Sequence, residues 1–117
     1  MSNFIPIADR TKQFAIRIIK ACSFLDQQSG VVRTLSKQLL RSGTSIGANV
    51  REAQSAQSDK DFLHKLEALK EARETEYWLE ILIESSIVEP KKFNALLQKA
   101  KEISKILVSS TRKLKEK

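Results

Sequence analysis

Cysteine, proline, glycine and aromatic residues are all scarce in this chain of 117 residues. Cys22 is the only cysteine, so no disulfide can form within the chain, and the lack of a recognisable secretory signal favours a cytoplasmic protein. Proline occurs only at positions 6 and 90, which leaves a long central region without a residue that breaks helices. No apolar run approaches the roughly 18 residues of a membrane-spanning helix, so we expect no membrane segment.

Hydrophobic residues recur every three or four positions in four separate stretches, which is the spacing of amphipathic helices. The stretches cover residues 8–27, 31–54, 58–85 and 90–114. Gly30 is suited to closing the first one, and Ser58 with Asp61 matches a capping box at the start of the third. Short connections favour antiparallel neighbours. The sequence therefore predicts one all-α domain over residues 1–117, an antiparallel up-down-up-down four-helix bundle with left-handed seam packing.

Two glycines, Gly43 and Gly47, lie in the middle of the second helical stretch. Each costs about 1 kcal/mol relative to alanine inside a helix, so their presence calls for a structural reason. Because they are four residues apart, they share one helix face and would let a second backbone approach closely. The alternative is a break at residues 42–45, which would divide the stretch into two shorter helices.

The third stretch contains two groups of apolar residues that cannot all face one narrow seam. The regular spacing assigns the buried face to Phe62, Leu66, Leu69, Ala72, Glu76, Leu79 and Ile83. At about 100° per residue, Trp78 and Leu82 point nearly away from that face, with Ile81 to one side. We expect Trp78, Ile81 and Leu82 to form an oligomer interface, because large exposed apolar groups are typical of one. The alternative is that this helix is rotated, or buried on two sides, within one subunit.

The net charge of +7 is distributed unevenly along the chain. Residues 1–51 carry +6, residues 52–89 carry −6 and residues 90–117 carry +7. In one interpretation the acidic segment neutralises its basic neighbours, and in the other a basic surface remains for an anionic partner. The candidate nucleic-acid-binding residues lie on the outer face of the last helix: Lys91, Lys92, Lys99, Lys101, Lys105, Arg112 and Lys113.

Residue types for catalysis or metal binding are poorly represented. His64 is the single histidine, which excludes the paired Glu-x-x-His ligands of a di-iron bundle, and Cys22 lies on an apolar helix face where we expect it to pack in the core. We therefore predict no catalytic residue, no metal and no cofactor. Polar residues of the second and third stretches are expected to fix helix register: Ser42, Ser45, Asn49, Glu52, Glu71 and Glu74. A carboxylate-lined metal or general-base site is the alternative.

Two parts of the sequence resemble a known bacterial family. Residues 40–52 read LRSGTSIGANVRE, and residues 62–79 read FLHKLEALKEARETEYWL. Together they resemble the four-helix bundle proteins known as 23S ribosomal RNA intervening-sequence proteins, and the resemblance spans nearly the whole chain. It implies a small cytoplasmic bundle that forms a ring-like homo-oligomer, a pentamer. The family is also similar to the accessory protein of diversity-generating retroelements, which implies a nucleic acid (RNA or DNA) and a reverse transcriptase as partners.

These features favour a non-enzymatic, oligomeric protein that associates with nucleic acid, RNA in particular, by neutralising phosphates with little reading of the bases. A scaffold that binds a protein partner is the alternative, in which the segregation of charge serves assembly. An enzyme that uses Glu71, Glu74 and Glu76 with a metal is a third hypothesis.

Overall fold

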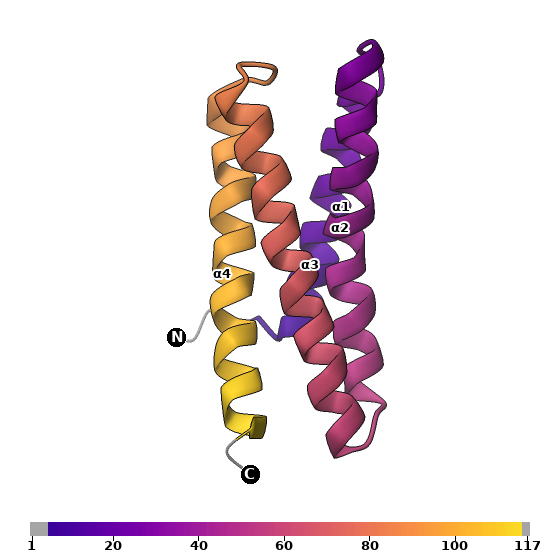
Figure 1. The fold of residues 1–117 in the computed structure, drawn as a ribbon, viewed down its shortest axis with the longest axis vertical. Helices are drawn as coiled ribbons and strands as arrows, with labels where there is room; N and C mark the ends of the chain where they lie inside the picture. Colours follow the sequence, from indigo (N-terminus) through magenta and orange to yellow (C-terminus); the bar gives the residue numbers. More distant parts are fainter. Residues whose placement is uncertain (1–4, 116–117) are drawn as a thin grey trace.

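Four α-helices follow one another along the chain in the computed structural model, which describes residues 5–115 apart from the side chains of Ser58, Leu114 and Lys115. The helices are α1 (Ile7–Leu25), α2 (Gly30–Gln54), α3 (Ser58–Glu84) and α4 (Pro90–Lys115). They run alternately up and down, and α1 lies behind α2 and α3 in Figure 1. The predicted all-α four-helix bundle is confirmed, and no strand occurs between residues 5 and 115. The handedness of the seam packing stays a prediction.

The ends of the helices follow local backbone chemistry. Gly30 adopts a positive φ of 46° at the junction of α1 and α2, as expected for a glycine between two helices. Pro90 begins α4, where its fixed φ and missing N–H suit the first turn. The N-cap of α3 is Gln57, one residue before the predicted Ser58, and Gln57 makes no side-chain capping bond. The carboxylate of Asp61 pairs instead with Lys65 at 3.7 Å, one turn further along.

One hydrophobic core extends along the bundle and receives side chains from all four helices. The apolar face of α1 is buried and consists of Phe14, Ile18, Ala21, Cys22 and Leu25. In α2 and α4 the buried apolar residues recur every three or four positions, as expected from the sequence: Leu39, Ile46, Val50, Ala53, Phe93, Leu96, Ala100, Ile103 and Leu107. Periodicity alone therefore locates the buried face of three helices, because each of the three has one continuous apolar stripe.

The two glycines of α2 allow α1 to pack closely. The helix is continuous from Gly30 to Gln54, so the alternative of a break at residues 42–45 is wrong. A Cβ atom on Gly43 would lie 2.9 Å from Cγ2 of the buried Ile18 side chain, and one on Gly47 would lie 3.5 Å from the backbone carbonyl of Thr11. Gly43 is thus required by the position of Ile18, whereas Gly47 lies at an ordinary van der Waals distance from the backbone of α1.

Replacing each glycine by alanine should separate these two situations. Both changes gain about 1 kcal/mol of helix propensity, but only Gly43→Ala forces Ile18 out of its position, at a cost of about 1–3 kcal/mol. Gly47→Ala is therefore the matched control, and chemical denaturation should find it more stable than Gly43→Ala by about 1–3 kcal/mol. Equal stabilities of the two variants would contradict the close contact between Ile18 and Gly43.

The predicted orientation of α3 is wrong in part. Ala72 and Leu79 are buried as expected, but Leu66 is 38% exposed and Leu82 is fully buried. Trp78 is partly buried against the core. Leu82 therefore cannot belong to an exposed oligomer patch with Trp78 and Ile81, and the alternative of burial on two sides within one subunit is confirmed.

The cause is that α3 packs against α2 on one side and α4 on the other. On the α2 side the hydroxyl of Thr75 donates a hydrogen bond to Ser42 Oγ at 3.0 Å. On the α4 side the hydroxyl of Ser104 donates to the carboxylate of Glu76. Adjacent residues of α3 thus face different helices, so its buried arc is wider than one seam, and the arc includes Leu82.

Candidate nucleic-acid interface

A polar group links α2 to α3 in the middle of the bundle. Arg41 donates to Glu71 Oε1 at 3.4 Å and to Glu74 Oε1 at 2.5 Å. Beside this cluster, the buried hydroxyl of Thr75 bonds to Ser42 and to the carbonyl of Glu71 at 2.8 Å. Since buried polar groups require partners, these bonds favour one register of the two helices over others.

The predicted register network is reproduced in part. Ser42, Glu71 and Glu74 bond across the α2–α3 contact, whereas Ser45 and Asn49 bond within α2, to the carbonyls of Arg41 and Ser45 respectively. Glu52 is exposed, and none of the hydrogen bonds or ion pairs found in residues 5–115 involves its side chain. The missed members are Arg41 and Thr75. Both lie next to predicted residues in the sequence. The rotation of each helix about its axis decides which of two neighbouring residues faces the other helix.

The two carboxyl groups bound by Arg41 have different environments. Burial raises the pKa of Glu71, and the neighbouring Glu74 raises it further, with partial compensation by Arg41. The hydrogen bond from Arg41 lowers the pKa of Glu74. Glu74 is therefore the carboxylate whose charge Arg41 stabilises, whereas ionisation of Glu71 is disfavoured. This division is expected when two acids share one base. In the part of the chain that the structure describes, no three His, Cys, Asp or Glu residues are placed to hold a metal ion.

Substituting the two carboxyls separately should give opposite effects. Glu71→Gln removes a disfavoured buried charge while the amide oxygen can still accept from Arg41, so we expect a melting temperature a few degrees above that of the native protein at pH 7. Glu74→Gln loses a charge-assisted bond and should lower the melting temperature by a few degrees at pH 7.

The sign of each pH effect follows from the direction of the pKa shift. The lowered pKa of Glu74 stabilises the fold above the ordinary glutamate range, and this contribution is lost as the pH falls through the folded-state value. The raised pKa of Glu71 makes its ionisation destabilising as the pH rises through its folded-state value. Both variants should therefore converge on the native melting temperature at low pH. Parallel pH profiles for the two variants would contradict this assignment.

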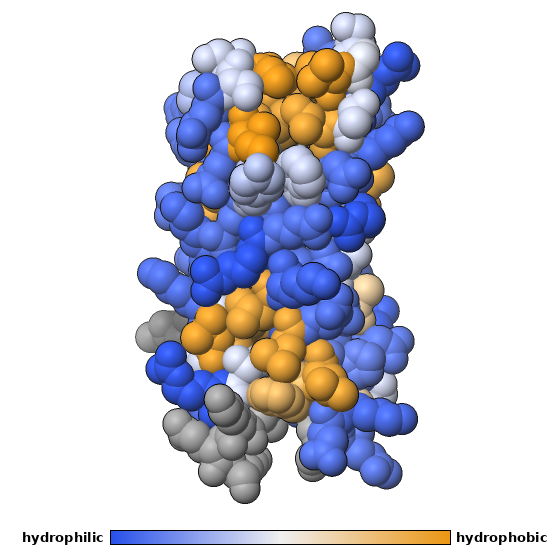
Figure 2. Space-filling model, in the orientation of Figure 1, coloured by the Kyte–Doolittle hydropathy of each residue, from blue (hydrophilic) through white to orange (hydrophobic). Residues whose placement is uncertain are grey.

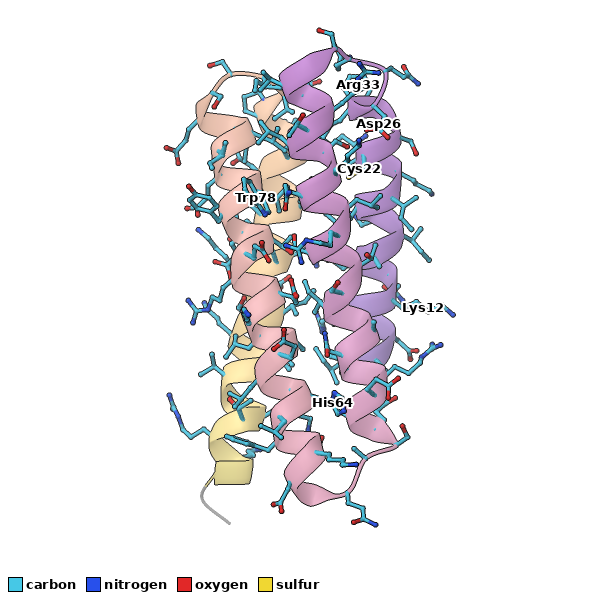
Figure 3. All side chains as sticks on the ribbon, turned by 45° about the vertical axis from the view of Figure 1, so that its right-hand side comes forward. Lys12, Cys22, Asp26, Arg33, His64 and Trp78 are labelled. Atoms are coloured by element: carbon cyan, nitrogen blue, oxygen red, sulfur yellow. The ribbon has the colours of Figure 1, made fainter. Side chains whose placement is uncertain are left out.

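The thiol of Cys22 is held in an environment that disfavours reaction as a nucleophile. Cys22 lies between α1 and α2 in Figure 3, where its thiol donates to the carbonyl of Ser36 at 3.5 Å. Burial raises the pKa of the Cys22 thiol, which opposes formation of the reactive thiolate. The expectation that Cys22 packs in the core is confirmed, since it is 2% exposed.

The basic residues predicted on the last helix do not form one continuous patch. Lys99 lines a cleft between α4 and α1, whereas Lys101 and Lys105 line a groove between α4 and α3. These residues lie on opposite edges of α4 because two residues along a helix correspond to a turn of about 200°. The other predicted residues are exposed along the same helix: Lys91, Lys92, Arg112 and Lys113.

Each edge of α4 gains basic residues from a neighbouring helix, which sequence patterns did not identify. Arg73 of α3 lines the same groove as Lys101 and Lys105. Arg10 and Arg17 of α1 line the same cleft as Lys99. The spacing of seven residues between Arg10 and Arg17, which places them on one helix face, is the signal that could have found the second group.

Comparison with known proteins identifies the family. The sequence profile described as "23S rRNA-intervening sequence protein" matches residues 5–109. The chain belongs to this family. A crystal structure at 1.70 Å resolution of a protein with unknown function from the S23 ribosomal protein family of Bacteroides thetaiotaomicron VPI-5482 is similar, with 43% sequence identity and a TM-score of 0.84. The match covers 91% of this chain and 98% of the Bacteroides chain. No curated protein matches.

Membership of the 23S rRNA-intervening sequence protein family confirms the resemblance carried by residues 40–52 and 62–79. Those two segments form the central parts of α2 and α3, which hold the glycine contact with α1 and the Arg41 cluster. The family description names no enzymatic activity, and the Bacteroides relative is described as having unknown function. Among the helices of residues 5–115, none has the length and apolar character needed to cross a membrane.

Proposed function

We propose that the protein is a non-enzymatic, self-assembling bundle that binds RNA through the two basic edges of α4. The observation that carries the proposal is the convergence of cations from different helices on each edge, Arg73 with Lys101 and Lys105 on one and Arg10 and Arg17 with Lys99 on the other. Side chains of this kind neutralise phosphates and give affinity with little dependence on base sequence. The description of the family by an intervening sequence of 23S rRNA supports RNA over DNA as the ligand.

Limited reading of bases follows from the distribution of aromatic side chains. Tyr77 is 56% exposed and lies edge-on to Trp78, with ring centroids 5.3 Å apart. Both belong to the acidic helix α3 and neither lines the two basic clefts, so stacking of single-stranded bases beside the cations is poorly supported. Structured RNA, which presents its phosphates on the surface, is therefore the favoured ligand.

Exposed apolar side chains favour self-assembly, although not through the patch predicted from the sequence. Ile16 and Ile19 of α1 are 46% and 47% exposed, and Leu63 of α3 is 61% exposed. Figure 2 shows apolar side chains gathered in two areas of one face with polar ones between them. Because the exposed apolar groups of α1 and α3 belong to different surfaces of one subunit, their contact between copies would be head-to-tail. This is the kind of interface from which rings are built when the rotation between copies closes. The pentamer implied by the family resemblance is of this type.

A scaffold for a protein partner is the second candidate, and the exposed apolar groups of α1 and α3 favour it as much as they favour self-assembly. A reverse transcriptase, suggested by the similarity of the family to the retroelement accessory protein, would be such a partner. In this alternative the basic edges of α4 serve solubility or assembly, and nucleic acid is not bound. For both functions the proposed location is the cytoplasm.

Sedimentation velocity of the protein alone and with a labelled structured RNA tests the proposal. We expect a discrete species larger than the 13.3 kDa chain and co-sedimentation of the RNA with it. A larger species that leaves the RNA unshifted would favour the scaffold. A 13.3 kDa monomer that leaves the RNA unshifted would contradict both parts of the proposal.

A further inference from the structure

The cleft between α1 and α4 has an unusual composition. It has a volume of about 70 Å³ and is lined by the cations Arg10, Arg17 and Lys99 together with Gln13, over an apolar floor that includes Phe14 and Ile103. Among the residues that the structure describes, no carboxylate lines the cleft. The cleft lies between the N-terminal half of α1 and the middle of α4.

The positive charge in this cleft is only partly balanced by the protein. Lys99 pairs with Glu102 at 3.3 Å, and both side chains are about half exposed. Neither Arg10 nor Arg17 takes part in the ion pairs found among residues 5–115. Like charges held close together without counter-charges are destabilising, and the cost decreases when an anion binds between them.

One of the cations that line the cleft also has a buried donor atom without a partner. Nε of Arg10 is buried and has no hydrogen-bond partner, although buried polar atoms of native proteins nearly always have one. A water molecule in the cleft would leave the charge of the three cations unbalanced. An oxyanion balances it, and guanidinium groups bind phosphate oxygens through paired N–H donors.

We infer that the α1–α4 cleft is a phosphate-binding site, in which Arg10 and Arg17 hold the oxyanion and Lys99 adds a third positive charge from α4. Gln13, one turn from both arginines, supplies a neutral donor to the same group. The assignment of this phosphate to an RNA backbone rests on the proposed function. The same chemistry would bind the phosphate of a free mononucleotide.

The first test is thermal unfolding with increasing inorganic phosphate at constant ionic strength. Ligand that binds the folded state raises the melting temperature, so we expect an increase of a few degrees for the native protein. Arg10→Gln/Arg17→Gln should show no increase beyond that caused by chloride. Arg33→Gln/Lys37→Gln is the matched control, which removes two exposed charges from α2 that do not line the cleft and should respond as the native protein does. An equal phosphate response in all three proteins would overturn the inference.

Two further variants keep the test decisive if Arg10→Gln/Arg17→Gln does not fold. Lys99→Gln changes a half-exposed side chain and should reduce the phosphate response. Arg10→Lys/Arg17→Lys keeps both charges but loses the paired donors. Its phosphate response should be smaller than that of the native protein and larger than that of the double variant Arg17→Gln/Lys99→Gln. A full phosphate response in both Lys99→Gln and Arg10→Lys/Arg17→Lys would equally overturn the site.

The source of the phosphate is distinguished by comparing three ligands: inorganic phosphate, adenosine monophosphate and a structured RNA. For RNA, loss of two contacts should lower the affinity of Arg10→Gln/Arg17→Gln roughly 10- to 100-fold and reduce the salt slope by about 2. Unchanged RNA affinity and slope with a lost inorganic-phosphate response would assign the site to small phosphates. If the native protein binds no RNA but responds to inorganic phosphate, the proposed function fails while the site stands.

Discussion

Leu82→Ala is expected to lower the free energy of unfolding by about 2–5 kcal/mol. Leu82 of α3 is fully buried in the core, so removing its side chain leaves a cavity that the helices cannot fill completely. A cost of this size is a large share of the 5–15 kcal/mol that stabilises a typical domain. The measurement is urea denaturation followed by circular dichroism at several protein concentrations, because self-association contributes to apparent stability.

Leu63→Ala is the matched control for this experiment. Leu63 lies on the same helix but is 61% exposed, so its truncation should change the stability of the subunit by no more than about 0.5 kcal/mol. A change of oligomer size in Leu63→Ala with unchanged stability would support a role of the outer face of α3 in assembly. A Leu82→Ala protein that is as stable as the native one but smaller in solution would restore the interface predicted from the sequence.

The triple variant Lys101→Glu/Lys105→Glu/Arg112→Glu is expected to bind structured RNA roughly a thousandfold less tightly at low salt. Three phosphate contacts would be lost, each a charge-assisted bond, and the substituted carboxylates would repel the backbone. Helix content should be retained because all three changes lie outside the core. Fluorescence anisotropy of a labelled RNA measures the loss.

A control of equal charge separates this surface from the charge of the whole protein. Arg33→Glu/Lys37→Glu/Lys60→Glu also reverses three exposed cations, at the start of α2 and α3, and therefore leaves the edges of α4 intact. It should weaken binding far less than the α4 variant. Equal losses in the two variants would show that net charge, and no particular surface, controls binding.

Sequence periodicity was sufficient for three of the four helices and insufficient for α3. In α1, α2 and α4 a single stripe such as Phe14–Ile18–Leu25 faces a single core, so spacing and burial agree. In α3 the contacts of Thr75 with α2 and of Glu76 with α4 divide the buried arc between two neighbours. The spacing of apolar residues in α3 fits two arrangements equally well: one wide buried arc, or a narrow buried seam with a separate exposed patch. Which of them forms depends on how α2 and α4 are placed around α3.

The candidate site shows the same limit. The cations of α4 could be named from the sequence, but their division between two edges depends on which helices flank α4. The periodicity of α1 identifies only its buried face and therefore leaves out Arg10 and Arg17, although both line the cleft with Phe14 where α1 meets α4. The prediction for α2 also differs from the structure in part, since Arg41, four residues before Ser45, reaches the carboxylates of α3.

The most direct test of the central claim is the salt dependence of binding by the native protein. Fluorescence anisotropy would compare a structured RNA, a single-stranded RNA and a duplex DNA between about 50 and 200 mM salt, a range over which several phosphate contacts change affinity strongly. We expect structured RNA to bind most tightly, with a logarithmic slope that corresponds to about 0.7–0.9 per phosphate contacted. Absence of binding to all three ligands at about 50 mM salt, where phosphate contacts are strong, would contradict an RNA-binding function.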